Sequence, residues 1–159
     1  MNPVLIIQHT ATEGPGYFSE FLGRQAIPWQ IIRIDAGEAL PDMLNGYSGL
    51  CLMGGTMSVN DDLPWIPQEL ALIRQAVTQG VPVVGHCLGG QLLSKAMGGV
   101  VTKNPVKEIG WGEVRITDAS VAEGWVKNTD QPMNVFHWHG ETFSIPPQAV
   151  RLWESTYCP

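Results

Sequence analysis

The fold of this chain is decided by the stretch Val81-Pro82-Val83-Val84-Gly85-His86-Cys87-Leu88-Gly89-Gly90-Gln91-Leu92-Leu93. It consists of an apolar run, a Gly-x-Cys-x-Gly turn, and a segment whose apolar residues recur at helical spacing. The run Val81–Val84 has no alternating polar residue, which is typical of a parallel strand covered on both faces. The stretch therefore predicts a strand, a tight turn and a helix, with Cys87 in the turn.

Other segments repeat this order of strand and helix. We predict strands over Val4–Gln8, Gln30–Ile34 and Leu50–Met53, and helices over Tyr17–Gln25, Pro67–Thr78 and Leu88–Met97. This alternation indicates a doubly wound α/β fold with a mostly parallel sheet. In the second helix, Leu70, Ile73 and Val77 recur at helical spacing and should pack on the sheet, and Gly80 follows where the helix should end.

The pattern changes after Gly98 and Gly99. Three short alternating segments follow, over Val114–Thr117, Asn134–Trp138 and Val150–Trp153, separated by Gly, Pro and Asp. Such alternation is typical of strands with one exposed face, so we expect a few antiparallel strands in the C-terminal third. Because no repeat or flexible linker interrupts the chain, we expect a single domain over residues 1–159.

Composition excludes several classes of partner. The chain has 9 Lys and Arg against 15 Asp and Glu, a net charge of −6, and no basic cluster. Nucleic acids and anionic membranes bind mainly through such clusters, so we expect neither as a partner. The longest apolar run, Val4–Ile7, is far shorter than the ~20 residues of a membrane span. The N-terminus lacks the pattern of a secretory signal, and we predict a cytoplasmic protein.

The three cysteines differ in what surrounds them. Cys51, Cys87 and Cys158 are too few, and odd in number, for a disulfide framework, so each should be a free thiol, with Cys51 in the core. The turn should hold Cys87 in a strained conformation, because side chains at Gly85 and Gly89 would collide. The helix that follows should lower the pKa of the Cys87 thiol. Cys87 is therefore a candidate nucleophile; the alternative is a small buried side chain in an ordinary turn.

A second glycine turn, Gly54-Gly55, ends the apolar segment Leu50–Met53. The carboxyl ends of parallel strands line one crevice, so both turns can face the same pocket. The backbone N–H groups of Gly55 and Leu88 would then form the two-donor oxyanion hole of acyl-transfer chemistry. A phosphate site is disfavoured, because the chain has no Gly-x-x-x-x-Gly-Lys-Ser/Thr pattern.

Four segments occur in a characteristic order along the chain. They are Met53-Gly54-Gly55-Thr56-Met57-Ser58, Gly85-His86-Cys87-Leu88-Gly89-Gly90-Gln91, Ile109-Gly110-Trp111-Gly112-Glu113-Val114 and Phe136-His137-Trp138-His139-Gly140-Glu141-Thr142-Phe143. Together they resemble the class I glutamine amidotransferases, in particular the glutaminase domain of GMP synthetase. The resemblance implies a flavodoxin-like α/β fold of the class I amidotransferase type.

The resemblance also implies a reaction. Cys87 would attack the side-chain amide of glutamine, forming a γ-glutamyl thioester and ammonia, and water would then release glutamate. It implies substrate contacts by Gly54, Gln91, His139, Gly140 and Glu141. No cofactor is implied, and a synthase partner or another acceptor would use the ammonia.

One part of the family pattern is missing from the sequence. The family's base and its orienting acid lie in a His-Pro-Glu motif beyond the segment that matches Val150–Ser155, and this sequence stops at Pro159 before such a motif. We therefore expect the chain to be a C-terminally truncated part of a longer one. His137 or His139 as a substitute base is the weaker interpretation, as is a metal held by these two histidines and Cys87; we predict no metal.

Two further functions stay open from the sequence. One is γ-glutamyl peptide hydrolysis, which the same nucleophile and oxyanion hole would serve. The other is a catalytically silent domain that binds a glutamine-like ligand or a partner protein. The 6 Trp and few charged residues also leave room for an apolar interface, so a homo-oligomer stays open.

Overall fold

The computed structural model describes residues 1–117, 124 and 132–158. The chain divides into two compact units, Met1–Met97 and Gly98–Pro159, and the boundary falls at the Gly98-Gly99 pair where the sequence pattern changes. The single domain predicted over residues 1–159 stays a prediction, because each unit is described by itself. No helix in the described ranges has the length and apolar character of a membrane span.

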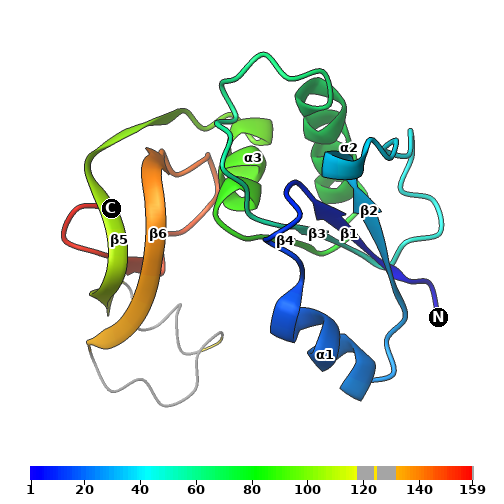
Figure 1. The fold of residues 1–159 in the computed structure, drawn as a ribbon, viewed down its shortest axis with the longest axis horizontal. Helices are drawn as coiled ribbons and strands as arrows, with labels where there is room; N and C mark the ends of the chain where they lie inside the picture. The colour runs from blue at the N-terminus through cyan, green and yellow to red at the C-terminus, as the bar shows by residue number, and fades with distance from the viewer. Residues whose placement is uncertain (118–123, 125–131, 159) are drawn as a thin grey trace. The chain divides into compact units, whose positions relative to one another are not determined.

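The first unit is a parallel α/β sheet with helices on both faces (Figure 1). It contains β1 (Val4–Gln8), α1 (Gly16–Arg24), β2 (Trp29–Arg33), the short helix η1 (Ile34–Ala36), β3 (Gly49–Leu52), α2 (Ile66–Thr78), β4 (Val83–Gly85) and α3 (Leu88–Ala96). The strands pair in parallel in the order β2-β1-β3-β4. The doubly wound α/β fold predicted from the sequence is confirmed.

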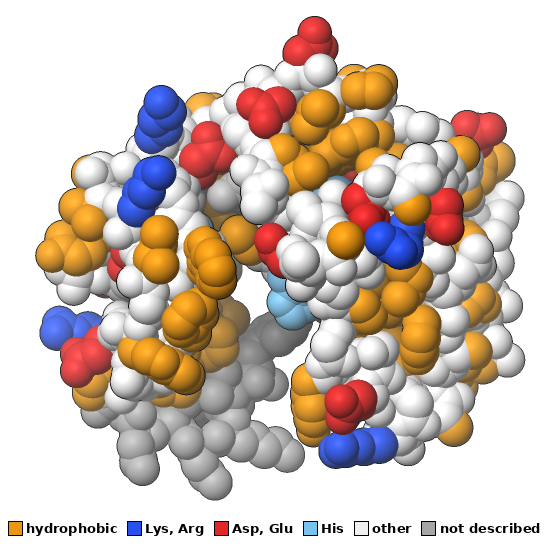
Figure 2. Space-filling view, in the orientation of Figure 1, with side chains coloured by type: hydrophobic (Ala, Val, Ile, Leu, Met, Phe, Trp, Pro, Cys, Tyr) orange, Lys and Arg blue, Asp and Glu red, His pale blue; other side chains and the backbone are white. Residues whose placement is uncertain are grey.

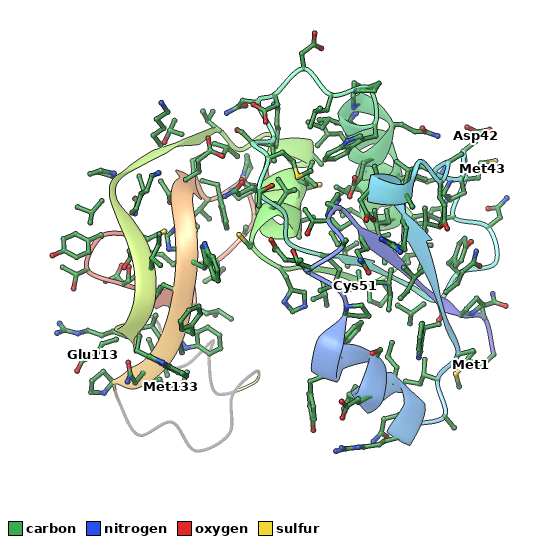
Figure 3. The ribbon with its side chains drawn as sticks, in the orientation of Figure 1. Met1, Asp42, Met43, Cys51, Glu113 and Met133 are labelled. Carbon is green, nitrogen blue, oxygen red and sulfur yellow. The ribbon has the colours of Figure 1, made fainter. Side chains whose placement is uncertain are left out.

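Side chains of β1 and β3 alternate between the two faces of the sheet, so each face has apolar side chains for a helix to cover. Ile6 and its register partner Cys51 are fully buried and pack with Leu22 of α1, as the position of Cys51 in Figure 3 illustrates. Successive side chains of a strand point to opposite faces, so Ile7 and Leu52 face the other side, where α3 lies against Leu52. Cys51 is fully buried, which confirms it as a core residue, and this burial raises the pKa of its thiol to about 11.

Two details of the predicted packing are wrong. The buried face of α2 is formed by Ile66, Glu69, Leu72, Ile73 and Ala76, whereas Val77 is exposed. Of the residues expected to pack, Ile73 is fully buried and Leu70 only half-buried. In addition, Val84 is 44% exposed, because β4 forms an edge of the described sheet and is not covered on both faces. The end of α2 is as predicted, with Gly80 at φ 69°.

The second unit is built on a long antiparallel ribbon. Its strands are β5 (Val101–Ile116), β6 (Met133–Phe143) and β7 (Trp153–Glu154), in the order β6-β5-β7. The expected antiparallel pairing is therefore confirmed, but the predicted bounds are not. The segments predicted over Val114–Thr117 and Asn134–Trp138 fall largely within longer strands, and the strand predicted over Val150–Trp153 is wrong, because β7 includes only Trp153 of it. Glu113 and Met133 lie at the same end of the ribbon (Figure 3), in agreement with the pairing of β5 and β6.

One face of this ribbon is aromatic and open to solvent. Trp111, Phe136 and Trp138 are all exposed, and their rings meet edge to face at centroid distances of 5.6 and 6.1 Å. Figure 2 shows hydrophobic side chains gathered on the surface of this unit. Trp138 therefore points to the opposite face of β6 from its neighbours His137 and His139, as alternation along a strand predicts.

Candidate active site

Cys87 occupies the turn between β4 and α3. Its backbone has φ 50° and ψ −109°, a conformation that L-residues rarely adopt and that costs about 1–3 kcal/mol. The residue is accessible to solvent, and α3 begins at the next residue. The strained turn predicted from Gly-x-Cys-x-Gly is confirmed.

The two flanking glycines allow this turn to pack against its neighbours. A Cβ on Gly85 would lie 2.5 Å from the backbone carbon of Gly89. A Cβ on Gly89 would lie 2.6 Å from the Cβ of Leu52 in β3. Because neither position has room for a side chain, the first turn of α3 lies directly on β3 and β4, as the sequence predicts.

The Gly54-Gly55 turn lies beside Cys87. A Cβ on Gly54 would lie 3.7 Å from the Cβ of Cys87, and a Cβ on Gly55 would lie 2.7 Å from the Cδ2 of Leu88. The structure thus brings together the two glycine turns that the sequence placed around one pocket. A hydrogen bond from the Leu88 backbone N–H to Cys87 directs one of the two predicted oxyanion donors at the sulfur.

The electrostatics of Cys87 differ from the prediction. Partial burial raises the pKa of its thiol, the hydrogen bond from the Leu88 N–H lowers it, and the Glu13 carboxylate raises it further. The net direction is upward: the N–H at the start of α3 lowers the pKa as expected, but burial and the Glu13 carboxylate outweigh it. The thiol therefore needs a proton acceptor in order to react at neutral pH.

Glu13 is a site residue that the sequence analysis missed. Its carboxylate occupies the space that a side chain on Gly54 would fill, with its Cδ 3.4 Å from that Cβ position. It belongs to the loop that follows β1, and this loop matches no motif. The position of the loop at the carboxyl end of an inner parallel strand is the one signal that could have indicated Glu13.

Replacing Glu13 by glutamine is expected to lower the pKa of Cys87, because it removes a negative charge beside the sulfur. Below the thiol pKa, the fraction of thiolate then rises, and alkylation of Cys87 by iodoacetamide should become a few-fold faster at neutral pH. The measurement is the rate of alkylation of Cys87 against pH, followed by mass spectrometry. The matched control is Glu20→Gln on the exposed face of α1, which should leave the curve unchanged. An unshifted curve for Glu13→Gln would contradict this account.

Gln91 lies on α3, one turn after the cysteine. Its backbone N–H donates to the Cys87 carbonyl at 3.1 Å, and the residue is 6% exposed. Its predicted contact with substrate stays a prediction, but its position beside the turn agrees with that role.

A buried pair behind Gly55 was also missed. The Nε2 atom of His9 lies 3.0 and 3.1 Å from the two carboxylate oxygens of Glu69, and both side chains are fully buried. The Cβ of His9 is 3.2 Å from the position of a Cβ on Gly55, and its ring packs beside Trp65 at 5.2 Å. The His9 side chain of this buried pair therefore packs against the Gly54-Gly55 turn.

The remaining predicted substrate residues belong to the second unit. His139, Gly140 and Glu141 all lie within β6, which continues straight through them without a turn. The Nδ1–H of His139 donates to the Glu141 carbonyl at 3.1 Å, and its Nε2 is 3.1 Å from Oε2 of Glu108. The imidazole of His139 is thus held by its own unit, and the three substrate roles stay predictions.

A cysteine at a strained strand-to-helix turn, with a glycine turn beside it, defines a class of α/β proteins suited to covalent chemistry at a carbonyl group. The model of the family "Glutamine amidotransferase class-I" matches residues 22–156. The chain belongs to the class I glutamine amidotransferase family.

Relatives of known sequence agree with this family. The chain is 32% identical to the putative glutamine amidotransferase-like protein YfeJ of Salmonella typhimurium, over 98% of this chain and 67% of the relative. It is 30% identical to the glutamine-hydrolyzing GMP synthase of Vibrio campbellii, over 82% of this chain and 23% of the relative. The chain thus spans about two thirds of the first relative and about a quarter of the second.

Solved structures agree as well. A glutamine amidotransferase from Methylobacillus flagellatus has 52% sequence identity and a TM-score of 0.95, over 99% of this chain and 63% of that one. A glutamine amidotransferase from Thermotoga maritima has 29% identity and a TM-score of 0.87, over 99% of this chain and 68% of that one. The flavodoxin-like fold of class I amidotransferases is therefore confirmed.

Proposed function

We propose that this chain carries the nucleophile and the glutamine pocket of a glutaminase. The observation that carries the proposal is the strained turn at Cys87, with the Leu88 N–H on the sulfur and the Gly54-Gly55 turn alongside. The close approach of Gly55 to Leu88 supports an oxyanion hole made of their two backbone N–H groups.

The proposed reaction has two steps. In the first, the sulfur of Cys87 bonds to the side-chain amide carbon of glutamine, and the carbonyl electrons move to an oxygen held by Gly55 and Leu88. When this intermediate collapses, the C–N bond breaks, and the nitrogen takes a proton and leaves as ammonia. In the second step, water attacks the γ-glutamyl thioester, and glutamate leaves as the thiol of Cys87 is restored.

A base has to accept the thiol proton, because the pKa of Cys87 is raised. The resemblance assigns this role to a His-Pro-Glu motif, and no such tripeptide occurs in the 159-residue sequence. The resemblance assigns substrate contacts to Gly54, Gln91, His139, Gly140 and Glu141. Because relatives are named glutamine-hydrolyzing GMP synthases, we propose that the ammonia passes to a synthase partner.

The test compares two substrates. Glutamate release is measured with glutamine and with a γ-glutamyl dipeptide, from neutral to alkaline pH, since alkaline pH supplies thiolate without a base. We expect kcat/KM to be at least about tenfold higher for glutamine and to rise with pH as Cys87 ionises. A preference for the dipeptide would instead establish a γ-glutamyl peptide hydrolase. No glutamate from either substrate, with the Cys87→Ala variant behaving identically, would establish the silent binding domain.

A further inference from the structure

Three metal-ligating side chains share one face of the β5–β6 ribbon. Glu108 on β5 is the register partner of His139 on β6, and Gly110 is the partner of His137. Side chains two residues apart on a strand point the same way, so the carboxylate and both imidazoles meet on one face. One ligand atom from each residue lies within 4.8 Å of the others, and all three residues are half-buried.

The hydrogen bonds of His139 leave a place for a cation. A backbone carbonyl can only accept, so Nδ1 of His139 carries the proton that is donated to Glu141. Neutral imidazole then has a lone pair on Nε2, and this atom lies 3.1 Å from Oε2 of Glu108, which is also an acceptor. Two acceptors at this distance require a positive charge between them, supplied either by a second proton or by a metal ion.

His137 distinguishes these two alternatives. Its Nε2 atom is buried and has no hydrogen-bond partner among the described residues. A second proton on His139 would involve only Glu108, whereas a metal ion would also bind a ring nitrogen of His137, because one ligand atom of His137 lies within 4.8 Å of those of the other two residues. The ring has room because Gly110 stands opposite it, and because a Cβ on Gly112 would lie 3.1 Å from its Nε2 atom.

We propose that Glu108, His137 and His139 bind a divalent transition-metal ion, with Zn²⁺ as the best match. Two imidazoles and one carboxylate form a known zinc ligand set, and tetrahedral zinc holds its ligand atoms about 3.3 Å apart. The 3.1 Å between His139 and Glu108 already fits this spacing.

Hydrogen bonds to neighbouring groups orient two of the three ligands, as is common at metal sites in proteins. His139 donates its other ring N–H to a carbonyl, and the hydroxyl of Ser155 donates to Oε2 of Glu108 at 2.8 Å. The ion would join β5 to β6 at the segment that also carries Gly140 and Glu141. The site shares His139 with the proposed substrate contacts, but its test does not depend on glutamine hydrolysis. It departs from the expectation of no metal, which considered the two histidines with Cys87 and not with Glu108.

The test is titration of the chelator-treated protein with Zn²⁺ by calorimetry, and with Co²⁺ by visible absorption. We expect one ion per chain and, in the His137→Ala and Glu108→Gln variants, at least about a tenfold weaker affinity. His137→Gln serves as a second variant of similar size, and circular dichroism shows which variants fold. The matched control is His86→Ala, an exposed histidine of the first unit, which should bind the metal like the unchanged protein.

Two cysteine variants test the alternative that the metal ion is bound through sulfur. Cys87→Ser and Cys158→Ser should leave the affinity unchanged, and the Co²⁺ complex should lack a sulfur-to-cobalt charge-transfer band. The proposal is overturned if no ion binds, or if binding depends on either cysteine and survives in the histidine and Glu108 variants. Neither result would affect the proposed glutaminase, whose test uses glutamine and Cys87.

Discussion

Replacing Cys87 by alanine is expected to abolish glutamine hydrolysis. Every step of the proposed reaction passes through a bond to this sulfur, and no other thiol lies at a strained strand-to-helix turn in the described residues. Without the sulfur no thioester can form, so the residual rate should equal that of the assay without protein. The measurement is glutamate release from saturating glutamine.

The control for this experiment is Cys158→Ala. Cys158 lies in the second unit, where its sulfur contacts the Thr142 hydroxyl at 3.2 Å, and it has no part in the proposed reaction. This variant should retain the rate of the unchanged protein. If Cys87→Ala kept more than about a tenth of that rate, hydrolysis would proceed without the thioester, and the assignment of the nucleophile would be wrong.

Replacing Gly89 by alanine is expected to destabilise the first unit strongly. The added methyl group would lie 2.6 Å from the Cβ and 2.7 Å from the backbone carbon of Leu52, well inside normal contact distance. Because neither β3 nor the first turn of α3 can move without disturbing the core, we expect a loss of about 2–4 kcal/mol. The measurement is urea unfolding followed by circular dichroism, together with the rate of alkylation of Cys87, since a displaced α3 would move the Leu88 N–H.

Gly23→Ala in α1 is the matched control, with the opposite sign. A Cβ at this helical position meets no atom within 4 Å, and Gly23 is exposed. Alanine should therefore stabilise the protein by about 0.5–1 kcal/mol through its higher helix propensity. Equal effects of the two substitutions would mean that α3 does not pack on β3 as closely as the structure places it.

Local patterns predicted most of the first unit. The helices α1, α2 and α3 each begin and end within a residue or so of their expected bounds, because amphipathic spacing and Gly80 are signals within the segment itself. The length of β5 could not be predicted in this way. Pro105, Gly110 and Gly112 are typical turn residues, yet all three belong to β5. Pro105 lies within the register shift between Lys103 and Glu108, and Gly110 and Gly112 make room for His137. Contacts between strands therefore override local propensity there.

In the candidate site, too, local features could be predicted from the sequence and features that depend on distant contacts could not. The turn at Cys87 was predictable, because the need for Gly85 and Gly89 follows from the geometry of a single turn. The direction of the thiol pKa was not, because it depends on burial and on Glu13, which a distant loop brings to the sulfur. Glu108 could not be predicted as a neighbour of the two histidines either, because only the pairing of β5 with β6 brings it beside them.

The central claim is that Cys87 is a nucleophile inside a pocket for glutamine. The most direct measurement is the intact mass of the protein after treatment with an electrophilic glutamine analogue, followed by peptide mapping, with and without an excess of free glutamine. We predict one adduct per chain, at Cys87 and not at Cys51 or Cys158, and slower labelling when glutamine is present. Equal labelling of Cys87 and Cys158, or a rate at Cys87 that glutamine leaves unchanged, would contradict the claim.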